Sequence, residues 1–258
     1  MIFMKLISLN LWGGRVYDKL QVFLTQKSKD VDVFCFQEML DESMIIEQEL
    51  LDMKKAYSGL ETNEISNLYS KLRPLLPNFE SILAKPHSSG GERNVIFYKR
   101  GLEIKEKGEL TTAEAIKIDF KGFSFEVGSG LQYIKTGGCT IINFHGVWQG
   151  GGKDDTPERL KQSEKIVEFL SKMHGKKILI GDFNLTPMTK SIKIIEDSGL
   201  QNLIKINNVQ STRSALYARS SKGKFADYAF VSENVKVNDF EVLQEEVSDH
   251  LPLYLDFT

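Results

Sequence analysis

The stretch "KILIGDFNLTP", residues 177–187, is an apolar run that stops abruptly at a glycine, an acid, an aromatic residue and an amide. The residues at 178–180 are typical of a strand buried on both faces. Asp182 and Asn184 are two positions apart, so on an extended chain their side chains point the same way. A carboxylate beside a carboxamide can bind a hard metal ion or orient a water molecule, although Gly, Asp and Asn are also common in turns.

The bulk properties of the chain are those of an ordinary globular protein. It has 258 residues, of which 41% are hydrophobic and 26% charged, and its formal net charge is -2. This length suits one large domain or two small ones. Because the chain has no repeat, low-complexity tract or long linker, we expect one domain over residues 1–258. The small net charge gives no overall signal for a polyanionic partner, but it leaves a local basic patch open.

The two cysteines and the apolar runs indicate the cellular setting. Cys35 and Cys139 lie in strand-like apolar runs, so we expect buried free thiols in a reducing compartment. No stretch approaches the roughly 20 apolar residues that span a bilayer. The N-terminal stretch lacks a basic region and a cleavage site, so a signal peptide is not expected. The prediction is a cytoplasmic protein with no integral membrane segment and no obligate protein partner.

Apolar runs rich in Ile, Val, Phe and Tyr alternate with segments of helical spacing, which predicts an α/β fold. The expected strands cover residues 5–10, 31–37, 94–99, 139–145, 176–182, 226–232 and 251–257. The expected helices cover residues 16–29, 41–55, 156–175 and 189–199. In the third helix, Pro157 suits the first turn and Gly175 the end. Loops are expected at 86–93, 146–155 and 219–225.

Polar residues of the metal-binding and proton-transfer types fall at the ends of these apolar runs. Ligand sites in α/β proteins lie at strand ends, so a recurrence of such residues there indicates a site. One acid at a strand end carries little weight by itself, whereas several at corresponding positions are hard to attribute to chance. The residues are Asn10, Gln37, Glu38, His145, Asp182, Asn184, Asp227, Asp249 and His250.

Six motifs along the chain make it similar to the endonuclease/exonuclease/phosphatase superfamily. They are "SLNLWGG", "FCFQEM", "INFHGVW", "IGDFNLTP", "ADYAFVS" and "SDHLPLYLDF", and they occur in the family's order from residue 8 to residue 257. This superfamily includes apurinic endonucleases, pancreatic deoxyribonuclease, inositol polyphosphate phosphatases and neutral sphingomyelinases. The resemblance implies a four-layered α/β sandwich, in which two mixed β-sheets pack face to face with helices outside.

The resemblance also implies a metal site. Glu38 is similar to the family's principal metal ligand and Asp249 to a second ligand. Asn10 is similar to the neighbour of Glu38 in the metal shell, or lies one hydrogen bond out. The expected ion is Mg²⁺, with Mn²⁺ as a substitute, because a carboxylate with water ligands suits Mg²⁺. Two of these residues also have simpler structural explanations, since Glu38 could be the acid at the start of a helix and Asn10 could belong to a turn.

The catalytic roles follow from the same resemblance. Asp182 is expected to orient or deprotonate the attacking water, and Asn184 to hold the phosphate or that water. His250 is expected to donate a hydrogen bond to a non-bridging phosphate oxygen as charge builds in the transition state. Asp227 is expected to orient His250, although it could also be a charge at a strand edge.

Two residues bear on the subclass. His145 takes a position where apurinic endonucleases carry a tyrosine, whereas pancreatic deoxyribonuclease and the sphingomyelinases carry a histidine. We expect His145 to contact phosphate or donate a proton. Trp12, in "NLWGG", is similar to the start of neutral sphingomyelinases, but core packing is the commoner reason for a tryptophan.

Basic residues are candidates for contacts with phosphate or substrate. Arg213 opens a run through Lys224 that contains no acid, and Tyr217 within it could stack on a base. The other cations of this run are Arg219 and Lys222. Two further arginine candidates are Arg93 and Arg159, and of all these we expect substrate binding chiefly from Arg93 and Arg213.

These expectations combine into a Mg²⁺-dependent phosphohydrolase in which water attacks phosphorus in line. A nuclease acting as a phosphodiesterase on nucleic acid is the first choice, on family breadth. A sphingomyelinase-like phospholipase, motivated by Trp12 and His145, and an inositol-phosphate phosphatase are alternatives. A non-catalytic binding relative fits less well, because every catalytic-type position is filled.

Overall fold

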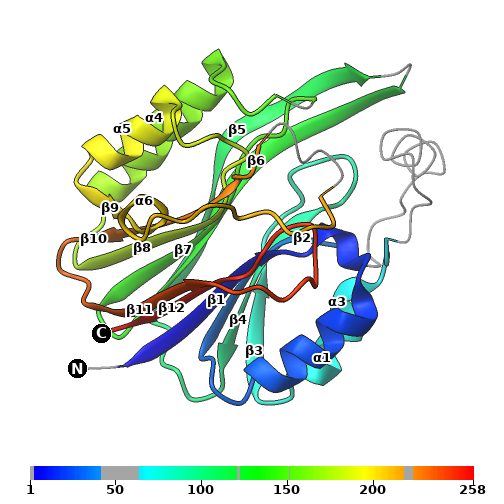
Figure 1. Ribbon diagram of the computed structural model, residues 1–258, viewed down its shortest axis with the longest axis vertical. Coiled ribbons are helices and arrows are strands. Elements are labelled where there is room, and N and C mark those ends of the chain that lie inside the picture. The colour runs from blue at the N-terminus through cyan, green and yellow to red at the C-terminus, as the bar shows by residue number, and fades with distance from the viewer. Residues whose placement is uncertain (1–2, 42–63, 121–122, 151, 218–222) are drawn as a thin grey trace.

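The computed structural model describes residues 3–41, 64–120, 123–150, 152–217 and 223–258. Figure 1 shows the described chain as two β-sheets that lie face to face, with helices on the outer side of each. This arrangement is the four-layered sandwich that the motifs implied. The expected helix at 41–55 and the basic residues Arg219 and Lys222 lie outside the described residues, except for Asp41 at the helix's first position.

In the described part of the chain, the first sheet has six strands. The parallel pair β1–β2 sits at its centre, and the other neighbours pair antiparallel, so the sheet is mixed. From edge to edge the strands are β11 (Val237–Val242), β12 (Leu253–Phe257), β1 (Met4–Asn10), β2 (Val33–Met39), β4 (Arg93–Lys99) and β3 (Phe79–Leu83).

The second sheet also has six strands among the described residues, and it too is mixed. The pair β7–β8 is parallel, and the other neighbours are antiparallel. In order the strands are β5 (Glu106–Phe120), β6 (Phe123–Thr136), β7 (Cys139–His145), β8 (Lys176–Asp182), β10 (Asp227–Ser232) and β9 (Leu200–Asn202).

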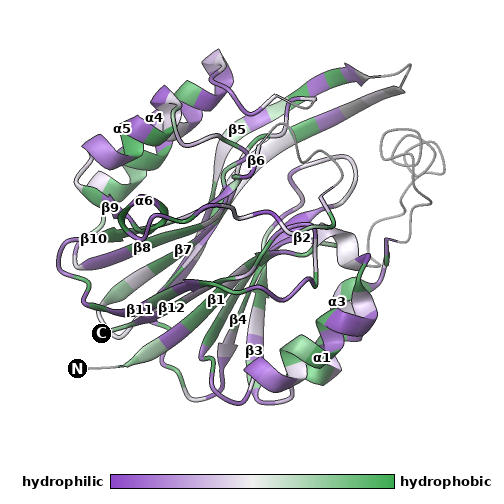
Figure 2. Cartoon of the chain, in the orientation of Figure 1, coloured by the Kyte–Doolittle hydropathy of each residue, from purple (hydrophilic) through white to green (hydrophobic). Residues whose placement is uncertain are grey.

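Helices cover the outer face of each sheet (Figure 1). In Figure 2 the helices carry hydrophilic and hydrophobic colours in alternation, as expected when one helix face packs on a sheet. Beside the first sheet lie α1 (Tyr17–Lys27), α3 (Leu68–Leu72) and the short 3₁₀ segment η2 (Arg73–Leu75). Beside the second lie α4 (Pro157–Ser171), α5 (Lys190–Asp197) and α6 (Leu203–Ile206). A further 3₁₀ turn, η1 (Trp12–Gly14), follows β1.

The space between the sheets is filled by apolar side chains from both. Leu6, Cys35 and Ile96 of the first sheet belong to one buried cluster with Ile142 and Leu179 of the second. Both cysteines of the chain are free thiols, as expected, and burial raises the pKa of each. At roughly 25 cal/mol per Å² of apolar surface, this layer is a main source of the fold's stability.

Hydrogen bonds of buried amide side chains cross this apolar layer beneath the strand ends. Gln37 donates from Nε2 to Oδ1 of Asn143 at 2.6 Å, which ties β2 to β7. Asn143 in turn donates from Nδ2 to the carbonyl oxygen of Phe36 at 2.9 Å. Both amide side chains are fully buried. Because an unpaired buried amide is costly, this pairing fixes how the two sheets are aligned at that end.

The seven expected strands are all present, with bounds within two residues at most ends. The long hairpin of β5 and β6 was missed, because its exposed stretches alternate charged and apolar residues and carry glycines. The third expected helix ends at Ser171 rather than at Gly175. Gly175, with φ 84°, instead forms the turn into β8. Among the described residues, no helix is long and apolar enough to cross a membrane.

Candidate active site

The polar strand-end residues converge because of how the strands pair. In the parallel pair β7–β8, His145 is the register partner of Asp182. The antiparallel strand β10 begins where β8 ends, so Asp227 is also a register partner of Asp182. Asn10 ends β1 beside the end of β2, which carries Glu38. The carboxyl ends of four strands and the start of a fifth therefore meet at one edge of the sandwich.

Asn10 joins the two sheets at this edge. Its Nδ2 donates to Oε1 of Glu38 and to Oδ2 of Asp182, each at 2.9 Å. Its Oδ1 accepts from the backbone N–H of Trp12 at 2.9 Å. The amide is fully buried, and its bond to Asp182 spans 172 residues of sequence. One side chain thus holds two carboxylates from different sheets next to each other.

Asp182 is buried and remains ionised. Burial by itself would raise its pKa, but the nearby cationic groups of His250, His145, Arg213 and Lys153 outweigh that effect and lower the pKa of Asp182. Its two oxygens accept hydrogen bonds, Oδ2 from Asn10 and Oδ1 from the backbone N–H of Asn184 at 2.8 Å.

The sharp turn after β8 combines two unusual backbone conformations with close approaches to neighbouring backbone. Gly181 has φ 144°, and a Cβ there would lie 2.0 Å from the carbonyl oxygen of Phe144. Asn184 has φ 54°, a left-handed conformation that asparagine tolerates better than most residues. Its Nδ2 donates to the carbonyl oxygen of Gly146 at 3.1 Å. A Cβ on Gly146 would lie 2.3 Å from the carbonyl oxygen of Phe183.

His250 and Asp227 form a buried pair beside Asp182. Nδ1 of His250 lies 2.8 and 2.9 Å from the two carboxylate oxygens of Asp227, and Nε2 lies 3.6 Å from Oδ2 of Asp182. Burial and the charge of Arg213 act to lower the pKa of His250. Three carboxylates, those of Asp227, Asp249 and Asp182, outweigh them and raise it. The imidazolium form is therefore favoured, with Nε2 directed at the site.

Glu38 has the surroundings of a carboxylate that suits a divalent cation. It lies at a bulge in the β2–β4 ladder between Phe36 and Met39, and its φ is 53°. Such a bulge re-aims a side chain near a site, and the strained backbone is typical of functional positions. Desolvation raises the pKa of Glu38, so its negative charge is not fully compensated within the protein.

In the part of the chain that the structure describes, two groups of side chains have metal-type ligand atoms close together. One is Glu38, His145 and Asp182, and the other is Asp182, Asp227 and His250, each with its ligand atoms within 4.8 Å of one another. The carboxylate oxygens of Glu38 and Asp182 in the first group are the hard ligands that Mg²⁺ or Mn²⁺ takes. The second group fits a metal less well, because His250 already uses Nδ1 on Asp227.

Asp249 and Arg213 form an ion pair at one side of the site. Nη1 of Arg213 lies 2.7 Å from Oδ2 of Asp249, and both side chains are nearly buried. The other oxygen of Asp249, Oδ1, lies 3.8 Å from Nε2 of His250. Asp249 is thus within the site, but one of its oxygens is already taken by the guanidinium.

His145 faces the same centre from the second sheet. Its Nε2 lies 3.9 Å from Oε1 of Glu38 and 4.0 Å from Oδ2 of Asp182. Behind it lies His87, which packs on Gly130, the register partner of His145. Burial, His145 and Arg93 lower the pKa of His87 to about 4, so His87 is a neutral neighbour.

The arginine candidates for substrate contact lie in different surroundings. Arg93 lies on the His145 side of the site and pairs with Asp41 at 3.6 Å. Arg159 is buried and donates to the carbonyl oxygens of Gly152 and Asp154, so its sequence interpretation as a phosphate contact is wrong. A buried arginine inside an amphipathic helix carries no sequence signal that separates it from a surface one.

Sequence reasoning missed Lys153. It lies in the loop after β7, and its Nζ donates to the carbonyl oxygen of Phe225 at 3.0 Å. The ring of Tyr217, a candidate for base stacking, instead contacts Lys153 and Arg213. Nothing in "GGGKDD" distinguishes this lysine from a solvated one, because the contact depends on a loop some 70 residues away.

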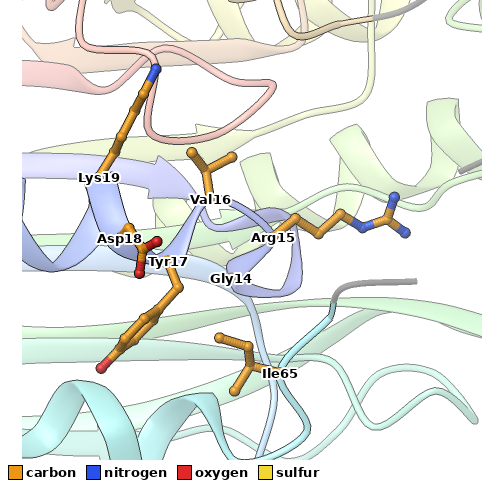
Figure 3. A pocket seen from close by; sticks show the side chains of 7 residues that line it. All are labelled: Gly14, Arg15, Val16, Tyr17, Asp18, Lys19 and Ile65. Carbon is orange, nitrogen blue, oxygen red and sulfur yellow. The ribbon is translucent and has the colours of Figure 1, made fainter. Parts of the chain in front are cut away.

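A hollow of about 340 Å³ lies elsewhere, at the start of α1. Figure 3 shows Arg15 extending to the opposite side of this hollow from Tyr17. Arg15 is paired with Glu64 at 2.8 Å and lies over the ring of Trp12. None of the predicted catalytic residues lines the hollow. Its lining residues are Gly14, Arg15, Val16, Tyr17, Asp18, Lys19 and Ile65.

Comparison with known families supplies the classification. The sequence profile of the Endonuclease/Exonuclease/phosphatase family matches residues 7–250. The chain belongs to this family. Its members are metal-dependent hydrolases of phosphoesters, so the protein is an enzyme that acts on ester bonds. A search among curated proteins finds no match.

Solved structures share this fold over the whole chain. A family member from Bacteroides vulgatus has a TM-score of 0.70 at 16% identity, and the match covers 100% of this chain and 99% of that one. The mannosyl-6-phosphatase of Bacteroides thetaiotaomicron has a TM-score of 0.67 at 19% identity, with 99% of each chain covered. D. rerio TDP2 in complex with a single-strand DNA product has a TM-score of 0.63 at 16% identity, with 100% of each covered. At these identities the likeness concerns the fold.

Proposed function

We propose that this enzyme is a divalent-metal-dependent phosphodiesterase that cleaves nucleic acid by direct attack of water on phosphorus. The observation that carries the proposal is the placement of Asp182 between Asn10 and His250. A carboxylate held ionised lies 3.6 Å from an imidazole that its neighbours keep protonated. Water activation and charge stabilisation at phosphorus need one group of each kind.

In this proposal Asp182 orients the attacking water through one of its oxygens. A carboxylate with a lowered pKa is a weak base, so orienting the water is favoured over taking its proton early. Asn184, fixed by Gly146, faces the phosphate with its amide. His250 donates from Nε2 to a non-bridging oxygen, and Asp227 holds the ring and its charge in place. His145 contacts the phosphate from the opposite side.

Glu38 is the residue that would hold the metal, with Asp249 as a further ligand candidate. Asn10 would support the site from one hydrogen bond out, because its NH₂ group donates to Glu38 and Asp182. The bound ion, Mg²⁺ or Mn²⁺, would neutralise charge that develops on the phosphoryl and leaving oxygens. The fit rests on the oxygen donors at the strand ends and on the incompletely compensated charge of Glu38. Asn10 holds the carboxylates of Glu38 and Asp182 next to each other, although they belong to different sheets.

Nucleic acid is the preferred substrate class for two reasons. The structure of D. rerio TDP2, which shares this fold, was solved with a single-strand DNA product. In this chain Lys153 and Arg213 place positive charge on one side of the site, where a polyanion would lie. A cytoplasmic location and a single domain over residues 1–258 remain part of this proposal.

One of the two residues that favoured the sphingomyelinase alternative, Trp12, has another explanation. Trp12 has its backbone N–H bound by Asn10 and its ring covered by Arg15, at 4.8 Å from the ring centroid. The tryptophan therefore has a local structural reason that requires no lipid. His145 remains compatible with both a nuclease and a sphingomyelinase.

The test is a hydrolysis screen of the purified protein with Mg²⁺ or Mn²⁺. The substrates are single-stranded and duplex DNA, RNA, sphingomyelin, inositol phosphates and mannose 6-phosphate. We expect cleavage of nucleic acid, and its loss in Asp182→Asn. The exposed Asp239→Asn variant is the matched control, and it should keep the parent activity. Turnover of sphingomyelin or of phosphomonoesters, with none of nucleic acid, would replace the proposed substrate class.

A further inference from the structure

Residues 152–155, which include Lys153, are held by hydrogen bonds from both neighbouring helices and from the segment after β8. Arg159 donates to the carbonyl oxygens of Gly152 and Asp154 at 2.8 and 2.7 Å, one residue before and one after Lys153. The carbonyl oxygen of Lys153 itself accepts from the backbone N–H of Thr186 at 2.9 Å. A buried arginine is thus used to fix the backbone of an otherwise irregular loop, so the position of Lys153 is preorganised.

The same loop is also tied to α5. Both carboxylate oxygens of Asp155 accept hydrogen bonds from the first residues of that helix, Lys190 and Ser191, at 2.7 and 2.9 Å. This carboxylate at a helix N-terminus is stabilised by unpaired backbone N–H groups. The anchors on both sides leave little freedom to the segment between them.

The ammonium group of Lys153 lies close enough to the carboxylates of Asp182, Asp227 and Asp249 for each to raise its pKa. Its Nζ donates to the carbonyl oxygen of Phe225 and lies 5.5 Å from the ring centroid of Tyr217. The guanidinium carbon of Arg213 lies 4.3 Å from the centroid of the same ring. One aromatic ring therefore gathers two cations beside the catalytic carboxylates.

The charges of these two cations are compensated differently. Arg213 is paired with Asp249 at 2.7 Å. Among the described residues, Lys153 has no carboxylate partner, and its contacts are a carbonyl oxygen and a ring. Burial and the neighbouring Arg213 lower the pKa of Lys153 to about 8. A half-buried ammonium group next to a second cation is stabilised when an anion binds between them.

We propose that Lys153 and Arg213 form a subsite for a second phosphate, next to the one that is cleaved. The preferred substrate then carries two phosphate groups. This inference rests on the proposed function, in which Asp182, His250 and the residues around Glu38 bind the scissile phosphate. Two sources share this chemistry: the neighbouring phosphate of a nucleic acid strand, and the second phosphate of a small bisphosphate ester.

The experiment compares pairs of substrates that differ by one phosphate. The first pair is the 4-nitrophenyl ester of thymidine 5′-phosphate, with and without a 3′-phosphate. The second pair is fructose 1,6-bisphosphate and fructose 6-phosphate. For each pair the measured quantity is the ratio of kcat/KM with the second phosphate to kcat/KM without it. We expect a ratio of about 10 to 100 for the parent, the size of one charge-assisted hydrogen bond.

Lys153→Met should bring this ratio close to one, and Lys153→Arg should restore most of it. Lys161→Met, an exposed lysine on α4, is the matched control and should behave as the parent. Lys153→Gln serves if the methionine variant unfolds at a lower temperature than the parent. A parent ratio near one in both pairs overturns the subsite, as does a ratio that Lys153→Met leaves unchanged.

The outcomes separate the two proposals. Selectivity in the thymidine pair supports the nucleic acid as the source of the second phosphate. Hydrolysis and selectivity in the sugar pair alone would reject the proposed phosphodiesterase function and still support the subsite. Cleavage of the thymidine esters without any preference would support the function and reject the subsite.

Discussion

Both carboxylate oxygens of Asp227 lie within hydrogen-bonding distance of Nδ1 of His250, at 2.8 and 2.9 Å. This contact leaves Nε2 as the ring nitrogen that faces Asp182. It also sets the tautomer in the neutral form of the ring, because a carboxylate accepts and Nδ1 must then carry the proton. The orientation and charge of His250 are therefore determined by a residue 23 positions away.

The first prediction concerns the charge on His250. In the metal-free protein its folded-state pKa is raised above the ordinary histidine value of 6.5, so the folded state binds the proton more tightly than the unfolded state does. The contribution of His250 to the free energy of unfolding is then fully present below pH 6.5. It is lost as the pH rises through the raised pKa.

The measurement is urea unfolding of the parent and of His250→Gln across pH 5 to 9, with chelator present. The difference between the two free energies of unfolding should shrink as the pH rises. His174→Gln changes an exposed histidine and should show no such trend. A difference that grows with pH would contradict the assigned sign.

The second prediction concerns Asp182→Asn. Both oxygens of Asp182 accept hydrogen bonds from N–H donors, whereas an asparagine offers one acceptor oxygen and places an NH₂ group against a donor. Turnover should fall by roughly two to four orders of magnitude, because the charge that orients the water is lost. Substrate affinity should change little.

Steady-state kinetics with a direct binding measurement would separate the two effects. The variant should also lose about 1–3 kcal/mol of stability, because a buried donor is left unsatisfied. If Asp182→Asn weakened binding and kept turnover, Asp182 would be a positioning residue for the substrate and not for the water.

The third prediction concerns the metal. Activity should vanish in EDTA and return with Mg²⁺ or Mn²⁺. Glu38→Ala should weaken metal affinity by at least about 10- to 100-fold, because removal of a group that merely supports a metal ligand already has an effect of that size. Calorimetry of Mg²⁺ or Mn²⁺ binding measures this without any substrate.

Glu164→Ala, which changes an exposed acid on α4, should bind the ion as the parent does. Folding of Glu38→Ala should be intact, because 30% of the Glu38 side-chain area is exposed. Full turnover in the presence of chelator would rule out the proposed mechanism.

The fourth prediction concerns Gly181→Ala. A Cβ at Gly181 would lie 2.0 Å from the carbonyl oxygen of Phe144, and φ there is 144°. Gly101 has φ 90°, and a Cβ added there would have nothing within 4 Å, so Gly101→Ala measures the cost of the backbone conformation without a clash. That cost is about 1–3 kcal/mol.

Gly181→Ala should destabilise the protein by more than Gly101→Ala does, because the strand β7 must move to accommodate the methyl group. Chemical denaturation of both variants gives the comparison. Equal losses at the two sites would mean that the turn after β8 adapts freely, and the close approach of β7 and β8 would then not determine where Asp182 lies.

More of the fold than of the site could be predicted from the sequence. The alternation of apolar strands and amphipathic helices is local, so seven strands and three of the four helices could be read from it within the described residues. Five of the described strands could not be read from it. Four of them, β3, β5, β9 and β11, are the edge strands of the two sheets, where the apolar signal is weak, and β6 pairs with one of these edges. The motif residues Glu38, Asp182 and His250 were recognisable one at a time.

Only the tertiary structure decided how these residues act on one another. Asn10 meets Asp182 through a contact between the two sheets, and Asp227 meets His250 because β10 starts where β8 ends. The ion pair of Arg213 with Asp249, 36 positions away, and the contact of Lys153 with Phe225, 72 positions away, likewise join loops far apart in sequence. The types of neighbouring residues and the spacing of the apolar ones determine whether a segment forms a strand or a helix. The pKa of a side chain and its bonding partners depend instead on charges and burial, which arise only when distant segments pack together.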